Sequence, residues 1–448
     1  MRIRRIRRIR RRASALLLLG GLVPLQGSAQ GEEEMALAAL APAIEALTLP
    51  HEAAGLLSGI VLVSRGDQVL YEGAYGHANW ELAHPVGPAT RFGVASIAKP
   101  MTEILVRLLA AEGALELDAP VDTYLEGFPT GPDGGRPTVA QLLAHRGGIP
   151  HRVTEPWEES RSLLAADMVA RIQVAGLLFE PGTDRLYSSA GYTALARVVE
   201  LLTGRSFHDV LAERVFDPAG MRSASGETGQ ALMPERAAPY RLGADHRAVV
   251  VKAAPYKDLR FLTGAGAVFA TAGDMVKFAR AIRHGVFGPA FTAEVFGGDP
   301  AQWVTFQGRT NGYEASVDIL PGPDLTLVFL SNLQSATNWQ LRARLMELLE
   351  GRAAKPIPLP PSVTPAFEEA SDLVGTFGPA EITLDGGRLF RGDNEFYPVA
   401  SARYYIPASG TLMRFRRDAA GRVDALISIS GSGEERVLPR SSGNEGDG

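Results

Sequence analysis

The sequence predicts an α/β fold in which an antiparallel sheet is flanked by helices and carries a helical subdomain, followed by a small all-β, barrel-like domain. Alternating apolar strands with turn residues between them lie at 57–75 and at 317–329, the pattern of β-hairpins. Segments with helical apolar spacing, separated by Gly and Pro, fill the interval 115–228. Beyond the proline-rich stretch 355–365, short strand-like runs alternate with turns, which favours a compact β unit.

Length and composition fit a globular chain with more than one domain. The 448 residues are 46% hydrophobic and 21% charged, and none is cysteine. We predict a large α/β domain at 30–351, a semi-rigid linker at 352–365, a small β domain at 366–440 and a disordered tail at 441–448. Without cysteine the chain can form no disulfide and offers no thiolate to a metal.

Residues 1–29 have the pattern of a secretory signal peptide. Eight arginines precede the apolar run 13–25, and Gly27-Ser28-Ala29 is a small-residue cleavage site. Arg11-Arg12 leaves twin-arginine export open. Loss of the eight arginines takes the formal net charge from −5 to −13, so we expect no nucleic-acid partner and no affinity for anionic membranes. The expected location is the periplasm or the medium, with no membrane anchor after cleavage.

The elements of the large domain are predicted in chain order. A helix at 32–49 precedes a hairpin of strands 57–63 and 69–75. The apolar spacing over 101–109 predicts a helix with Gly113 as its cap. Later elements are helices at 118–125, 138–145, 187–202, 274–284 and 340–349, and a hairpin at 317–320 and 325–329. Hairpins at both ends predict one sheet closed by the two ends of the domain, with the helical region inserted between them.

Ser96 and Lys99 stand three residues apart at the start of a predicted helix, which places them on one face. A serine hydroxyl is a weak nucleophile until a base takes its proton, and a lysine whose pKa is lowered by burial can be that base. The pair therefore predicts a nucleophile and its base. An exposed Ser and Lys on an ordinary helix is the alternative, because such a pair arises by chance in about a third of chains of this kind.

Four segments favour the nucleophile and base over that alternative. They lie at 92–102, 138–150, 179–192 and 308–313. In this order and spacing they resemble the serine β-lactamase and penicillin-binding-protein family, in its class C and β-lactamase-like carboxylesterase branch. The similarity covers most of 40–345 and implies that family's fold for the large domain. The C-terminal unit resembles the small lipocalin-like β domain that follows this domain in many relatives.

The resemblance also implies roles for single residues. Ser96 would be the acylated nucleophile, and Lys99 or Tyr187 would take its proton, either of them being possible as the base. Neighbouring cations can lower the pKa of a phenol towards phenolate, and Tyr187 would also pass a proton to the leaving group. The backbone N–H groups of Ser96 and of Arg309, which follows Gly308, would form the oxyanion hole.

Two predicted substrate-binding positions depart from the family's pattern. Ser189 stands where the second motif, Tyr-x-Asn, has its asparagine, and serine reaches less far towards a substrate amide. Phe306 stands two residues before Gly308, where the family has Lys or His. The usual cation for a substrate carboxylate is therefore absent, unless Arg309 supplies it from a displaced position. The closest parallel is the aromatic-x-Gly motif of the carboxylesterase branch.

These departures favour an exported serine hydrolase of small esters or peptide-like acyl compounds. Two alternatives stay open: a β-lactamase or D-amino-acid peptidase, and a binding or regulatory module with weak chemistry on the same fold. The expected partner is a small ester, amide or peptide-like molecule. No cofactor or metal is expected, since His145 and His151 match no metal-binding spacing and are interpreted as structural. Gly264-Ala-Gly266 is interpreted as a tight turn at the edge of the site.

Overall fold

The computed structural model describes residues 29–229, 231–244, 249–359, 370–385, 388–392, 394–400, 403–406, 411–430 and 434–441. The predicted signal peptide, apart from Ala29, lies outside the described residues, as do linker residues 360–365 and the tail from 442 onwards. The described part of the linker, 352–359, contains neither helix nor strand.

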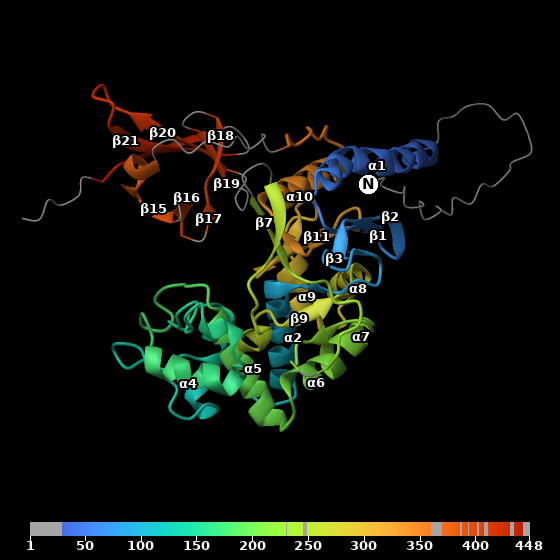
Figure 1. Ribbon diagram of the computed structural model, residues 1–448. Coiled ribbons are helices and arrows are strands. Elements are labelled where there is room, and N and C mark those ends of the chain that lie inside the picture. Colours follow the sequence, from blue (N-terminus) through green and yellow to red (C-terminus); the bar gives the residue numbers. More distant parts are fainter. Residues whose placement is uncertain are drawn as a thin grey trace, which may run out of the picture.

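A five-stranded antiparallel sheet organises the large domain, with the strand order β10-β11-β12-β1-β2 (Figure 1). The strands are β1 (Gly59–Arg65), β2 (Gln68–Tyr75), β10 (Val304–Thr310), β11 (Tyr313–Leu320) and β12 (Leu325–Ser331). β1 pairs with β12 in antiparallel register, Gly59 opposite Ser331 and Arg65 opposite Leu325. The two hairpins from opposite ends of the domain therefore join within one sheet, which confirms the sheet predicted from them.

Helices cover both faces of this sheet. The helices concerned are α1 (Ala29–Ala53), α2 (Ala98–Ala111), α8 (Ala272–Arg283) and α10 (Ala336–Leu349). Successive side chains of a strand point to opposite faces, so β1 sends Val61 and Val63 into the apolar cluster with α1 and α10. It sends Ile60 and Leu62 into the larger cluster with α2 and α8. β11 and β12 are buried along their whole length, as strands covered on both faces must be.

A helical region follows α2, as predicted. Its helices are α3 (Val139–Leu143), α4 (Ala165–Ala175), α5 (Ser189–Thr203), α6 (Phe207–Leu211) and α7 (Asp217–Ala219), with 3-10 turns at Val121–Thr123 and Glu158–Ser160 and a π-helical turn at Ala212–Phe216. The predicted helix at 118–125 is wrong in extent, because only the turn Val121–Thr123 forms. Pro120 is extended, with φ −60° and ψ 141°, and forms a bridge with Thr138, so no helix can run through it.

Short elements complete the large domain. They are β3 (His77–Asn79), β4 (His84–Pro85), β5 (Phe92–Gly93), β6 (Ser225–Gly226), β7 (Tyr240–Ala244), β8 (Val249–Ala253), β9 (Val268–Ala270), β13 (Leu333–Gln334), α9 (Pro289–Phe296) and 3-10 turns at Ala95–Ile97 and Leu259–Leu262. β7 and β8 form an antiparallel hairpin, and β7 also pairs with β13 in parallel. In Figure 1 the β7 strand reaches from the large domain towards the C-terminal strands.

The C-terminal unit is all-β, apart from a 3-10 turn at Ala370–Leu373. Its strands are β14 (Gly375–Phe377), β15 (Ala380–Asp385), β16 (Arg388–Arg391), β17 (Asn394–Glu395), β18 (Tyr397–Ala400), β19 (Arg403–Ile406), β20 (Thr411–Arg417), β21 (Val423–Ile429) and β22 (Glu435–Pro439). They form one four-stranded and one five-stranded sheet around a core of their own that includes Phe377, Phe396 and Phe415. The all-β class is confirmed, whereas closure into a barrel is not.

Candidate active site

Ser96 lies on a sharp turn between a strand and a helix. β5 pairs with β9, and the N–H of Val94 donates to Val268 O at 2.9 Å. Ala95 then adopts a positive φ of 49°, which is uncommon for a residue other than glycine. Ser96 follows in a 3-10 turn that precedes α2. The nucleophile candidate therefore stands just before the α-helix, not within it.

Lys99 is a buried amine that points at Ser96. Its side chain is 4% exposed, and its Nζ donates to Ser96 Oγ at 3.1 Å and to Ala265 O at 2.9 Å. Burial lowers the pKa of Lys99 to about 7, because a charged ammonium loses its hydration there. A substantial fraction of this amine is neutral at neutral pH, as a base must be. Ala265 belongs to the Gly264–Gly266 turn, which thus lies at the site's edge.

Tyr187 approaches the same hydroxyl from just before α5. Its phenol donates to Ser96 Oγ at 2.9 Å, and Lys99 Nζ lies 4.8 Å from its ring centroid. Burial raises the pKa of Tyr187, against the opposite effect of its bond to Ser96. This direction is contrary to the lowering towards phenolate considered from the sequence. The phenol keeps its proton at neutral pH and can act as a proton donor.

His145 and His151 flank the Tyr187 ring, with centroids 4.4 Å and 5.5 Å away. His145 has a φ of 59°, and its Nδ1 accepts the N–H of Ser188 at 3.1 Å. Burial lowers the pKa of His145 to about 4, so it is neutral at pH 7. Both contacts fit the structural interpretation. The contacts of the two rings with Tyr187 could not be predicted, because neither histidine stands near Tyr187 in the chain.

Gly308 allows β10 to lie directly against the Ser96 turn. A Cβ at Gly308 would lie 2.2 Å from Val94 O and 2.8 Å from Ser96 N, so any other residue would push the strand away. Arg309 is the next residue of β10. Its guanidinium Nε lies 3.4 Å from Glu314 Oε1. This neighbourhood is where an oxyanion would lie if Ser96 attacked a carbonyl.

The two positions that depart from the family's pattern have different surroundings. Ser189 lines the cavity above Ser96 and is 9% exposed, whereas Ser188 caps α5 by accepting the N–H of Gly191. Phe306 packs against Phe278 of α8, with ring centroids 6.2 Å apart, and is not among the described residues that line the cavity. The Phe306 ring is half-buried against the apolar core, and its contact with a substrate stays a prediction.

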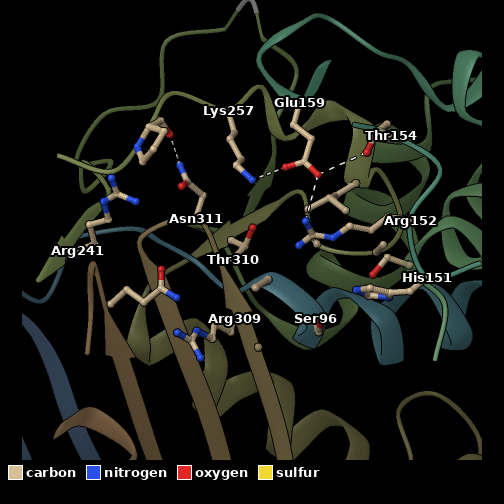
Figure 2. Close-up of a pocket in the computed structure, with 18 of the residues that line it drawn as sticks. Ser96, His151, Arg152, Thr154, Glu159, Arg241, Lys257, Arg309, Thr310 and Asn311 are labelled. Carbon is tan, nitrogen blue, oxygen red and sulfur yellow. Dashed lines mark hydrogen bonds and ion pairs between the residues drawn. The ribbon is translucent and has the colours of Figure 1, made fainter. Parts of the chain in front are cut away.

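A cavity of about 760 Å³ opens above Ser96, Tyr187 and Ser189, a volume typical of small-molecule sites. Figure 2 shows that polar side chains surround it. The charged residues on its lining are Arg152, Glu159, Arg241, Lys252, Lys257, Arg309 and Glu395. Sequence analysis identified Arg309 alone among them. The others come from loops and strands that are distant in the chain, and they form no local motif.

Glu159 organises one wall of the cavity. Its side chain is 1% exposed, and it forms ion pairs with Lys257 and, at 3.3 Å, with Arg152 Nη1. Thr154 Oγ1 donates to it at 3.4 Å. Figure 2 shows these groups converging opposite Arg309 and Asn311. A buried carboxylate with two cations holds their guanidinium and ammonium groups at the rim, where they can meet a polar substrate.

Among the described residues, no three His, Asp or Glu side chains gather as a metal site would need. No helix described here is both long and apolar enough to cross a membrane.

The site combines a Ser-x-x-Lys turn with a tyrosine whose phenol donates to that serine, and it lies between an antiparallel sheet and a helical region. This combination defines the class of serine β-lactamase-like hydrolases. Residues 44–350 match the family model described as Beta-lactamase. The chain therefore belongs to the beta-lactamase family.

The chain is similar to proteins of several kinds. Penicillin-binding protein 4* of Bacillus subtilis (strain 168) is 24% identical over 432 residues, which cover 85% of this chain and 94% of that protein. Esterase EstB of Burkholderia gladioli is 32% identical over 42% of this chain and 51% of the esterase. A D-aminopeptidase of Cereibacter sphaeroides (strain KD131 / KCTC 12085) is 31% identical over 42% of this chain and 36% of its own. The solved structure of SurE has a TM-score of 0.60 at 21% identity, covering 91% of this chain and 100% of SurE.

Proposed function

We propose that this chain is a serine hydrolase that cleaves small esters, or related acyl compounds, through an acyl-enzyme on Ser96. The observation that carries the proposal is the meeting of three side chains at the floor of one cavity. Ser96 Oγ is 3.1 Å from the amine of Lys99 and 2.9 Å from the phenol of Tyr187. A hydroxyl, an amine with a pKa of about 7 and a protonated phenol supply a nucleophile, a base and an acid.

Acylation follows from this arrangement. The neutral amine of Lys99 accepts the proton of Ser96 as Oγ bonds to the carbonyl carbon. The carbonyl oxygen becomes an oxyanion that accepts hydrogen bonds from the N–H groups of Ser96 and Arg309. The bond to the alcohol then breaks, Tyr187 donates its proton to the leaving alkoxide, and the proton held by Lys99 replaces it. The products are the alcohol and an ester on Ser96.

Deacylation uses water as the nucleophile and Ser96 as the leaving group. Lys99 accepts a proton from water as the oxygen of that water attacks the acyl carbon. Ser96 Oγ leaves, takes the proton back and releases the carboxylic acid. Lys99 is the base in both steps because its pKa lies near neutrality, whereas the pKa of Tyr187 is raised.

Ester substrates are favoured by what stands beside Ser96. The position two before Gly308 is Phe306, whose ring packs against Phe278, so no cation lies there to hold a penicillin carboxylate. Ser189 offers a substrate amide less than asparagine does. The similarity to an esterase supports the same preference.

A second candidate, a β-lactamase or D-amino-acid peptidase, is favoured by a different observation. Among the described residues, five cationic side chains line the cavity with two carboxylates. The cations are Arg152, Arg241, Lys252, Lys257 and Arg309, and the carboxylates are Glu159 and Glu395. This excess of positive charge suits a substrate with a carboxylate. Similarity to a penicillin-binding protein and to a D-aminopeptidase agrees with it.

Turnover by the purified protein decides between the two. The substrates are short-chain p-nitrophenyl esters, a chromogenic cephalosporin and D-alanine p-nitroanilide, each with Ser96→Ala as control. We expect ester hydrolysis that the control lacks. Fast turnover of the cephalosporin or the anilide without ester hydrolysis would support the second candidate. No turnover of any of the three would support a binding or regulatory module.

We further propose that the protein is exported. The support is the sequence pattern of residues 1–29, with its arginines, apolar run and small-residue cleavage site. Expression of the full chain in a Gram-negative host, followed by fractionation and N-terminal sequencing, tests it. A protein in the periplasm that begins near residue 30 is expected. Uncleaved protein confined to the cytoplasm would contradict export.

A further inference from the structure

The small β domain contributes side chains to the cavity that contains Ser96. Phe390, Asn394, Glu395, Tyr397 and Ile406, from β16 to β19, line that cavity together with residues of the large domain. We propose that the β domain forms a wall of the active site and selects substrates by the apolar group that reaches it. This inference rests on the proposed function, and it assigns to the β domain a part in substrate recognition.

An ion pair joins the two domains at this wall. Lys252 Nζ lies 4.0 Å from Glu395 Oε2. The stem of Lys252 crosses the neighbouring strand over Gly243, where a Cβ would lie 2.6 Å from Lys252 Cδ. The absence of a side chain at Gly243 therefore lets Lys252 reach the β domain.

Glu395 is held in place on its own side. It accepts hydrogen bonds from Tyr397 OH at 2.5 Å and from Arg388 Nη1 at 3.3 Å. Its side chain is 15% exposed. These hydrogen bonds fix the orientation of the Glu395 carboxylate, which forms the ion pair with Lys252.

The space between the domains is hollow rather than packed. A second cavity, of about 420 Å³, is lined by Arg241 and Pro255 of the large domain and by Thr383, Asp385, Phe390 and Gly392 of the β domain. Arg241, Pro255 and Phe390 line both cavities. The described residues thus leave room beside the site, where part of a substrate can lie against Phe390.

The wall has an apolar part and a polar part. Phe390, Tyr397 and Ile406 are aromatic or aliphatic, whereas Asn394 and Glu395 are polar. Tyr397 and Ile406 are buried in their domain, but Phe390 is only half-buried and is not part of its core. Phe390 is therefore available to a ligand. The substrate class that fits is an ester or amide with an aromatic or aliphatic group on one side of the reacting carbonyl.

Cross-linking tests the position of the wall without reference to catalysis. The chain has no cysteine, so Lys252→Cys with Glu395→Cys introduces the two thiols alone, and a short bis-maleimide can bridge them. The control pair is Lys252→Cys with Glu435→Cys, since β22 lies at the opposite edge of the sheet from β18. We expect an intramolecular cross-link in the first pair and none in the control. Equal cross-linking of the two, or none in either, would overturn the proposal.

Selectivity tests what the wall does. Phe390→Ala is compared with Val437→Ala, which truncates an exposed apolar residue of the same domain, 48% exposed and outside the lining of either cavity. The readout is the ratio of kcat/KM for p-nitrophenyl hexanoate to that for the acetate. We expect Phe390→Ala to lower this ratio about fivefold, the loss of part of one buried aromatic contact, and Val437→Ala to leave it unchanged. An unchanged ratio in Phe390→Ala would overturn the proposal while the ester hydrolase stands.

The outcomes for the two proposals are separable. A specific cross-link in the Lys252→Cys/Glu395→Cys variant, together with a wild type that hydrolyses neither ester, contradicts the proposed function and leaves the wall in place. A protein that hydrolyses both esters but gives no specific cross-link contradicts the wall alone.

Discussion

Replacing Lys99 by methionine removes the buried amine that contacts Ser96 Oγ and keeps much of its volume. Burial lowers the pKa of this amine from 10.5 to about 7. At pH 7 about half of the molecules then hold a neutral amine, whereas an unshifted lysine would be neutral in about one molecule in 3,000. We therefore expect the acylation rate to rise with pH, with an apparent pKa near 7 for this limb of the pH–rate profile. Lys99→Met should lower the acylation rate by about three orders of magnitude and remove this limb.

The assay is the pre-steady-state release of p-nitrophenol from p-nitrophenyl acetate between pH 5 and pH 9.

Burial of Lys99 also makes the free energy of unfolding depend on pH. Below pH 7 the folded state holds a buried charge, and between pH 7 and 10.5 it has lost a proton that the unfolded state still binds, so stability rises with pH. Lys99→Met buries no charge, so its Tm should exceed that of the wild type at pH 7. This difference in Tm should shrink as the pH rises from 7 to 10.5. A limb near pH 10, or one that survives in Lys99→Met, would refute Lys99 as the base and favour Tyr187.

Three further expectations concern neighbouring residues. Tyr187→Phe should slow the hydrolysis of alkyl esters about a hundredfold and that of p-nitrophenyl esters less, since p-nitrophenolate leaves without a proton; equal losses on a matched pair of esters would contradict the role of Tyr187 as the acid. Gly308→Ala should lower kcat by at least about a hundredfold, because its Cβ would lie 2.2 Å from Val94 O, and full activity of a folded variant would refute the approach of β10 to Ser96. Burial raises the pKa of Glu314 to about 7, so the folded state binds the extra proton between pH 4.5 and 7 and stability falls across this window by up to about 3 kcal/mol. Denaturant unfolding of Glu314→Gln should lack this fall, and parallel profiles for the variant and the wild type would contradict it.

The sheet could be predicted because its signals are local. Short apolar runs bounded by turn residues at 57–75 and 317–329 mark the two hairpins, although β1, β11 and β12 are buried on both faces. The helix predicted at 118–125 failed where a non-local contact decided the outcome: Pro120 bridges Thr138. The predicted barrel depends on how β14 to β22 close on one another, and strand alternation does not encode that closure.

The floor of the site could be predicted for a similar reason. Ser96 and Lys99 share one turn, whereas Tyr187 could be named only through the resemblance of segment 179–192 to the family's second motif. For Phe306 the alternation of β10 does not tell whether the ring meets a substrate, and in the fold the ring packs beside Phe278 of another element. No local motif predicts Glu159, Lys257 or Glu395, because each is an ordinary charged residue in its own segment. Tertiary structure alone brings them to one cavity.

Covalent labelling of Ser96 tests the central claim most directly. The mature protein and Ser96→Ala are each incubated with a fluorophosphonate, which phosphonylates a reactive serine with loss of fluoride, and are then measured by intact mass and peptide mapping. One adduct, located on Ser96 and missing from Ser96→Ala, is the expected result. An unmodified wild type, or an adduct on a different residue, would show that the hydroxyl, the amine and the phenol do not form a working nucleophile.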